Sequence, residues 1–232
     1  MSTELQLRPA TAGDLPAVAE VHIASRAAAV PAIPAGIHTD DEARAWVGSW
    51  DLTAYDVWLA LRGDEVVGYS RATPTWLDDL YVLPEAQGLG VGAALLDLVK
   101  AQHPDGFGLW VFESNAPARR FYARHGLVEL ERTDGSGNEE QAPDIKMAWP
   151  GADPLAFYRR LIDEVDADLG DLLARRTALT RAVQDVKPPG DRDERREADI
   201  VRRVAASVPE LGEARVARIL DVIITESLDA SR

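Results

Sequence analysis

Apolar and polar residues alternate in short blocks over the first 150 residues, and this pattern predicts a mixture of strands and helices. Segments 54–60 and 65–72 have the composition of two strands joined by a turn at Gly63. A third strand is expected at 76–82, ended by Pro84. The other elements expected after it are a helix near 90–102, a strand at 107–112, a helix at about 116–125, and strands at 127–132 and 144–149.

Two further helices are expected before the hairpin. Segments 14–26 and 40–50 have apolar residues at helical spacing, and each opens with an acidic residue that can cap a helix, Asp14 and Asp40. The first part of the chain is therefore predicted to be a mixed α/β domain.

The pattern changes after residue 150, where apolar residues recur every three or four positions. One long helix is expected up to Val186, because Pro188 and Pro189 follow it. Two shorter helices are expected, one beginning near 191–193 and one covering about 211–229.

The change of pattern predicts two domains, residues 1–150 and 151–232. Three helices in about 80 residues bury only a thin core, so such a unit needs a partner surface. We therefore expect a homodimer that forms through residues 153–232.

Composition excludes several classes of function. The chain has 232 residues and a net charge of -14, which disfavours nucleic acid and anionic membrane surfaces as partners. It has no cysteine, and its four histidines lack metal-ligand spacing, so no metal site is expected. No apolar run is long enough to span a bilayer and the N-terminus does not resemble a signal peptide, so a cytoplasmic location is expected.

A glycine-rich turn at 87–92 follows the third strand and opens a helix. Small residues there leave backbone N–H groups free to bind phosphate at a helix N-terminus. The Walker type of phosphate loop is excluded because no Gly-Lys-Ser/Thr follows. Gly88, Gly90 and Ala93 match the dinucleotide pattern, but no βαβ unit opens the chain, so that match is weak.

The segment 82–93, V-L-P-E-A-Q-G-L-G-V-G-A, resembles the acetyl-coenzyme A signature of the GNAT superfamily of N-acetyltransferases. The segment 115–127, N-A-P-A-R-R-F-Y-A-R-H-G-L, is similar to that family's second signature. The resemblance covers roughly residues 3–149 and implies a mixed sheet flanked by helices, with acetyl-coenzyme A as cosubstrate. The residues that it implies for coenzyme binding are Leu80, Tyr81, Val82, Gln87, Gly88, Leu89, Gly90, Val91, Gly92, Ala93 and Asn115.

The resemblance also implies direct attack of an amine on the thioester, with Tyr122 as the acid that protonates the leaving thiolate. The general base is less defined, since the glutamate of some relatives is replaced here by Trp110. We expect Asp79 to serve as the base. Carboxylates of the acidic loop are alternatives and would also attract a cationic amine: Glu139, Glu140 and Asp144. A peptide, a polyamine and an aminoglycoside-like amine all remain possible substrates.

Cations interrupt the apolar stripe of the long helix. Arg176 and Lys187 are eleven residues apart, which brings them to within about 20° of one face. Arg159 lies roughly 100° away around the same helix. Inward-facing cations need anions, and a dicarboxylate ligand would satisfy them.

These positions, with D-E-R-R-E at 193–197 and I-I-T-E-S at 223–227, resemble the all-helical chorismate mutase family over about residues 153–230. The resemblance makes the fold class α+β: a GNAT mixed sheet followed by an all-α three-helix domain. It implies that Arg176 and Arg196, together with Arg159 from a dimer partner, hold carboxylates. It also implies that Lys187 donates to the ether oxygen and that Asp193 and Glu197 bind or orient the hydroxyl.

One position departs from the chorismate mutase pattern, because Ser231 stands where the family has a glutamine. A serine side chain is shorter than that of glutamine, so activity of this domain is left open by the sequence. The alternatives are an isochorismate-pyruvate lyase, a module that binds a chorismate-like regulator, and a dimerisation module.

Overall fold

The computed structural model of the chain describes residues 4–186 and 193–230. Contacts divide the chain into two units, Met1–Tyr158 and Arg159–Arg232. The division falls eight residues after the expected boundary at residue 150, because Phe157 is buried in the first unit. A Cβ atom at Gly106 would lie 2.6 Å from the Phe157 ring, so only glycine allows this packing.

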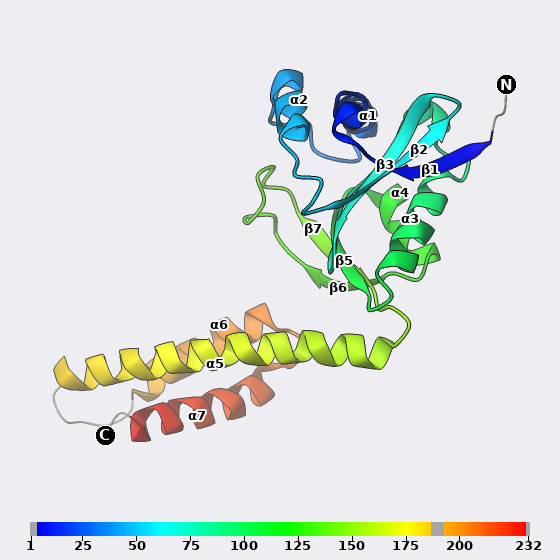
Figure 1. Cartoon of the computed structure of the whole chain (residues 1–232). Coiled ribbons are helices and arrows are strands. Elements are labelled where there is room, and N and C mark those ends of the chain that lie inside the picture. Colours follow the sequence, from blue (N-terminus) through cyan, green and yellow to red (C-terminus); the bar gives the residue numbers. More distant parts are fainter. Residues whose placement is uncertain (1–3, 187–192, 231–232) are drawn as a thin grey trace. The chain divides into compact units, whose positions relative to one another are not determined.

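The first unit is built on a seven-stranded sheet in the order β1-β2-β3-β4-β5-β7-β6 (Figure 1). Its strands are β1 (Leu5–Pro9), β2 (Asp56–Arg62), β3 (Glu65–Thr73), β4 (Trp76–Val82), β5 (Phe107–Phe112), β6 (Val128–Arg132) and β7 (Asp144–Trp149). All neighbours are antiparallel except β4 and β5, which are parallel. The predicted hairpin and the four later strands are present within one or two residues of their expected bounds.

Strand β1 was not predicted from the sequence. It has only five residues, contains Arg8 and ends at Pro9, so its pattern is weak. It is ordered by pairing with Trp58–Arg62 of β2, a long-range contact that no local pattern reveals.

Helices cover both faces of this sheet. The helices of the first unit are α1 (Leu15–Ala29), α2 (Asp40–Gly48), α3 (Val91–Gln102) and α4 (Ala116–Arg124), with short 3₁₀ turns at Ala12–Asp14 and Pro84–Ala86. The cap of α2 is Thr39 and not Asp40: its hydroxyl accepts from the Glu42 backbone N–H, while Glu42 bonds back to the Thr39 N–H. This reciprocal capping box outcompetes a single acidic cap.

Two apolar layers lie on opposite faces of the sheet. Val18, Val21 and Val47 of α1 and α2 pack with Leu59 and Tyr69 on one face. On the other face, α3 and α4 cover a layer formed by residues of β5 and β7. Leu109 of β5 and Ile145 and Met147 of β7 pack there with Leu96 of α3, and each of the four is at most 2% exposed.

The described part of the second unit consists of helices and the turn at 208–212. It contains most of α5 (Pro154–Val186) together with α6 (Glu194–Ser207) and α7 (Glu213–Asp229). Arg176 and Arg181 of α5 donate to the backbone carbonyls of Ile223 and Ala230 on or next to α7. No helix of the described residues is long and apolar enough to cross a membrane.

The apolar stripe of α5 is largely solvent-exposed within one chain. Its large apolar residues are three, four or seven positions apart: Leu155, Ile162, Val165, Leu169, Leu172, Leu179, Val183 and Val186. This is the a/d pattern of a helix that packs along a partner helix.

Candidate active sites

Strands β4 and β5 separate immediately after they meet. The single residue pair between them is Trp76 with Gly108. The Trp76 ring covers Gly108 so closely that an added Cβ would lie 2.4 Å from it. The edge of β4 beyond this point, which carries Leu80, Tyr81 and Val82, faces β5 without a ladder partner. An unpaired strand edge can bind an extended ligand as an added strand.

The glycine turn lies at the end of this free edge. Gly88 and Gly90 have φ values of +73° and +84°, which explains glycine at both positions. Space above both glycines is open, since a Cβ on either would meet nothing within 4 Å. Helix α3 begins at Val91, so the N–H groups of its first turn lack intrahelical acceptors and can bind an anion.

The other predicted coenzyme residues surround this turn. The Gln87 side chain donates to the Val82 carbonyl at 3.0 Å, which ties the turn to the strand. Leu89 is 54% exposed at the tip. Asn115 caps α4, where its Oδ1 accepts from the Ala118 N–H at 3.2 Å. This cap leaves the Nδ2 donor of Asn115 for other partners.

Tyr122 lies on α4 and packs with Phe121 against the core on the α3 side. Burial raises the pKa of its hydroxyl well above the ordinary value, and the nearby Tyr81 and Asp79 raise it further. The phenol therefore keeps its proton at neutral pH. That protonation state is the one required of a proton donor.

Asp79 is buried and paired, which differs from the free carboxylate expected of a base. Its Oδ2 accepts from Arg71 Nε at 2.6 Å. The Arg71 guanidinium lies 4.5 to 5.1 Å from the rings of Trp46, Trp50 and Tyr55, so it is enclosed by aromatic faces. Asp79 thus reaches Arg71 and is shielded from open solvent.

A β-bulge separates Asp79 from the start of β4. Arg71 pairs with Asp79 and Ala72 with Leu77, so Asp78 is the extra residue. Asp78 is exposed, in contrast to its neighbours Leu77 and Asp79. Burial of part of its carboxyl group raises its pKa, although the charge of Arg71 acts in the opposite direction. Sequence patterns gave no signal for this residue, since the bulge depends on the register with β3.

A cluster of aromatic contacts lies on the face of the sheet that carries α1 and α2. His22 on α1 has ring contacts with Trp46 and Tyr81, and its Nδ1 lies 2.9 Å from the Tyr69 hydroxyl. Burial, together with the charges of Arg26 and Arg71, lowers the pKa of His22 to about 4. His22 is therefore neutral at pH 7.

The acidic loop between β6 and β7 contacts the segment around α1 and α2. Arg26 donates to Glu140 at 2.7 Å and, at 3.4 Å, to the Tyr81 hydroxyl. His38 lies 3.0 Å from Glu139. Asp144, the third loop candidate for the base, instead accepts from the Asn138 side chain at 3.0 Å and from Thr133. Two of the three loop carboxylates thus lie on the side of the sheet that carries α1.

In the second unit, the predicted Arg176 and a serine of the matched segment 223–227 meet at one carbonyl. Arg176 Nη1 and Ser227 Oγ both donate to the Ile223 carbonyl, at 3.2 and 2.6 Å. Arg176 is half-buried at the border between the α7-facing side of α5 and the exposed stripe. Arg159 is exposed and opens this unit.

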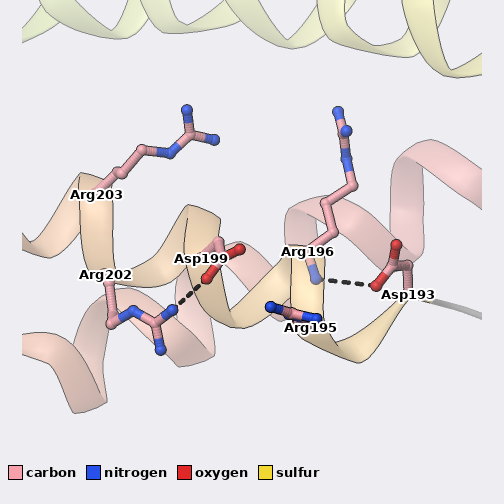
Figure 2. Close-up of a pocket in the computed structure, with 6 residues that line it drawn as sticks. All are labelled: Asp193, Arg195, Arg196, Asp199, Arg202 and Arg203. Carbon is pink, nitrogen blue, oxygen red and sulfur yellow. Dashed lines mark hydrogen bonds and ion pairs between the residues drawn. The ribbon is translucent and has the colours of Figure 1, made fainter.

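A hollow of about 620 Å³ lies beside α6. It is lined by Asp193, Arg195, Arg196, Asp199, Arg202 and Arg203. Arg196 and Arg203 extend from α6 on the same side, while Asp193 caps the helix by accepting from the Arg196 N–H at 3.0 Å (Figure 2). The hollow is rich in cations and suits an anionic ligand.

Several predicted residues are not brought into this hollow. Glu197 is half-buried on α6 and does not line it. Lys187 and Ser231 lie outside the described residues. Among the residues that are described, no group of three histidine, aspartate or glutamate side chains could hold a metal ion.

Two family models match the chain. The acetyltransferase (GNAT) family model matches residues 26–127, and the chorismate mutase type II model matches residues 158–232. The chain is 31% identical over 120 residues to an uncharacterised N-acetyltransferase of Archaeoglobus fulgidus, covering 41% of this chain and 81% of that protein.

Two further similarities concern the first unit. The chain is 29% identical over 147 residues to the peptidyl-lysine N-acetyltransferase YiaC of Escherichia coli, covering 62% of this chain and 96% of YiaC. It also resembles the structure of YncA from Salmonella typhimurium, a putative acetyltransferase with its cofactor acetyl-CoA. The TM-score is 0.50 at 20% identity, with 62% of this chain and 92% of YncA covered, which supports the predicted fold of this unit.

Proposed function

Because the chain belongs to the GNAT family of acetyltransferases through its first unit, and carries a chorismate mutase type II domain in its second, we propose that the first unit catalyses acetyl transfer. The first unit passes the acetyl group of acetyl-coenzyme A to a primary amine. The observation that carries this proposal is the free edge of β4, which leads directly to the open glycine turn.

Acetyl-coenzyme A supplies an activated acyl carbon when it is bound. Its pyrophosphate fits the N–H groups around Gly88 to Ala93, where both positive-φ glycines leave open space. Its extended arm fits the free edge of Leu80 to Val82. The Gln87 side chain holds the turn to this edge, and Asn115 offers its remaining amide donor.

Tyr122 protonates the thiolate as coenzyme A leaves. Its hydroxyl keeps its proton because burial raises its pKa, and an acid in the reaction must carry that proton when the carbon–sulfur bond breaks. The nearby charge of Asp79 and the hydroxyl of Tyr81 act in the same direction.

The amine approaches from the face that carries α1, α2 and the acidic loop. Glu139 and Glu140 give this side negative charge, which attracts an ammonium group. Both carboxylates already contact basic residues, so the amine must compete with His38 or Arg26 for them. Since YiaC is named for acetylation of peptidyl-lysine, a lysine side chain of a protein is the first acceptor to test.

The test measures acetyl transfer from acetyl-coenzyme A to three probes by mass spectrometry. The probes are an Nα-blocked lysine peptide, spermidine and kanamycin, which represent the three classes of amine. We expect acetylation of the peptide in the wild type. Absence of acetylation of every probe, together with absence of acetyl-coenzyme A binding by calorimetry, would refute the proposal.

For the second unit we propose the conversion of chorismate to prephenate. The reaction is unimolecular, so the protein needs only to fold the substrate and to stabilise charge as the ether bond breaks. Arg176 and Arg196 would hold the carboxylates, with Arg159 from a partner chain, and Lys187 would donate to the ether oxygen. Asp193 and Glu197 would orient the substrate hydroxyl.

Loss of chorismate absorbance tests this second activity. Arg176→Ala should abolish it, whereas Arg175→Ala, which alters an exposed arginine about 100° away around α5, should not. Conversion of isochorismate to salicylate and pyruvate would favour the lyase alternative. Binding of chorismate without turnover would favour the regulatory one.

The second unit also forms the dimer in this proposal. The exposed stripe of α5 places apolar residues at a and d positions over more than four heptads, and water would otherwise cover them. A second α5 is the simplest surface of matching length and pattern. Arg176 occupies an a position in this stripe, which puts one proposed site residue at the dimer contact.

A further inference from the structure

We propose that Asp78 is the general base of the acetyl transfer and that the ion pair between Arg71 and Asp79 holds it in place. The assignment rests on the proposed acetyl transfer and names a residue for its first proton step. Three features carry it: the bulge, the separation of the strands, and the environment of the carboxylate.

The bulge turns Asp78 out of the strand. In a regular strand, neighbouring side chains point to opposite faces of the sheet. Leu77 and Asp79 would then share one face, and the direction of Asp78 between them would be fixed. Here Leu77 pairs with Ala72 and packs into the apolar layer, while Asp79 pairs with Arg71 on the other face. Asp78 is the unpaired extra residue and is exposed. Bulges commonly redirect a side chain next to an active site.

The position along β4 is the second feature. Asp78 comes two residues after Trp76, the single point of pairing with β5. The edge that fits the coenzyme arm begins there and runs to Val82. A base at this point lies at the inner end of the coenzyme edge, where an extended arm would bring its acyl group.

The ion pair fixes this geometry. Arg71 and Asp79 form the last regular pair before the bulge, and both side chains are nearly inaccessible, at 11% and 7% exposed. Trp46, Trp50 and Tyr55 hold the guanidinium from three sides. Arg71 and Asp79 are therefore positioning residues, and the bulge cannot slip without separating a buried pair.

The charged environment suits a base. The charges that act on Asp78 come from Arg71 on β3 and from Asp79 beside it on β4, and these two are paired with each other. Nearby on the sheet, Lys146 Nζ of β7 lies 5.6 Å from the centre of the Trp76 ring. Within the described parts of the chain, Asp78 has no ion-pair partner of its own. Its raised pKa makes it a stronger base than an ordinary aspartate.

The nitrogen loses two protons as the ammonium becomes an amide. The Asp78 carboxylate takes one proton from the substrate ammonium and later returns it to solvent. The neutral nitrogen then attacks the thioester carbon, and the carbon–sulfur bond breaks. Tyr122 gives its proton to the sulfur, and the second nitrogen proton restores the phenol.

The experiment compares Asp78→Asn with the wild type in transfer from acetyl-coenzyme A to the Nα-blocked lysine peptide. We expect kcat/KM to fall by about 10²-fold or more, while acetyl-coenzyme A affinity stays within about twofold. The acid limb of the pH profile should disappear, and Asp78→Glu should restore part of the rate. Asp97→Asn, an exposed aspartate on α3, is the matched control and should behave as the wild type.

A second measurement does not depend on the acceptor. In carboxyl ¹³C NMR, the aspartate signal that Asp78→Asn removes should titrate above the ordinary value of about 3.9. A titration at or below that value, or equal rates for Asp78→Asn and wild type, would overturn the role of Asp78 alone. A wild type that binds acetyl-coenzyme A and acetylates no probe would instead count against the proposed function.

Discussion

Replacing Arg71 with methionine should destabilise the first unit by several kcal/mol. The change leaves the Asp79 carboxylate buried, at 7% exposed, without its partner at 2.6 Å. Removing one member of a buried ion pair costs about 3–5 kcal/mol, which is a large part of the roughly 5–15 kcal/mol that stabilises a domain. The double variant Arg71→Met/Asp79→Leu removes both charges and should recover most of the loss.

The loss should depend on pH in a defined direction. Burial already raises the pKa of Asp79 despite the opposing charge of Arg71, and without Arg71 it rises further. The folded variant then binds a proton more readily than the unfolded chain, whose aspartate pKa is about 3.9. Stability contributed by this proton is present below that value and is lost as pH rises through the folded pKa. The difference from the wild type should therefore be larger at pH 8 than at pH 5.

Tryptophan fluorescence during urea unfolding measures this effect in the whole chain. All six tryptophans lie between Trp46 and Trp149, so the signal reports on the first unit alone. Arg132→Met is the matched control, because Arg132 is 54% exposed in its pairs with Glu113 and Glu129 and should change stability by less than about 1 kcal/mol. Equal losses for the two variants, or a loss that grows as pH falls, would refute the reasoning.

Three further outcomes are expected. Tyr122→Phe should lower the rate of acetyl transfer by about 10²-fold or more while calorimetry finds unchanged acetyl-coenzyme A affinity; a joint loss of binding would indicate a packing role. Phe157→Ala should destabilise the first unit by about 3–5 kcal/mol in the same fluorescence assay, because Phe157 is 3% exposed against Gly106. Leu172→Lys should give a monomer by light scattering, whereas Ala178→Lys on the opposite side of α5 should leave the dimer intact.

The parts of the first unit that could be predicted are those encoded within a few residues of each other. Both signature segments combine glycines, a cap and a helix within about a dozen positions, so their chemistry is visible in sequence order. Gly88 and Gly90 have the positive φ values for which such a turn requires glycine. Strand β1 has no comparable local pattern, because its order comes from pairing with β2 some fifty residues away.

The residue that we propose as the base is harder still to identify from the sequence. Asp78 and Asp79 are adjacent, and alternation alone cannot decide which of them faces an open site. The register with β3 decides it, since the bulge between Arg71 and Ala72 buries Asp79 and exposes Asp78. Arg71 is eight residues from Asp79 in sequence, and nothing in its local pattern identifies it as the partner.

The second unit carries a different kind of missing information. Its helices and their order follow from the period of apolar residues, and α5 extends to Val186, the last residue described before 193. Most of the apolar residues that define that period nevertheless remain exposed in a single chain. The pattern predicts that these residues are buried, but a single chain leaves them in water. The two agree only if another surface covers the residues. Under the proposed dimer that surface is a second α5, and the site that Arg176 borders is then completed by residues that no single chain brings together.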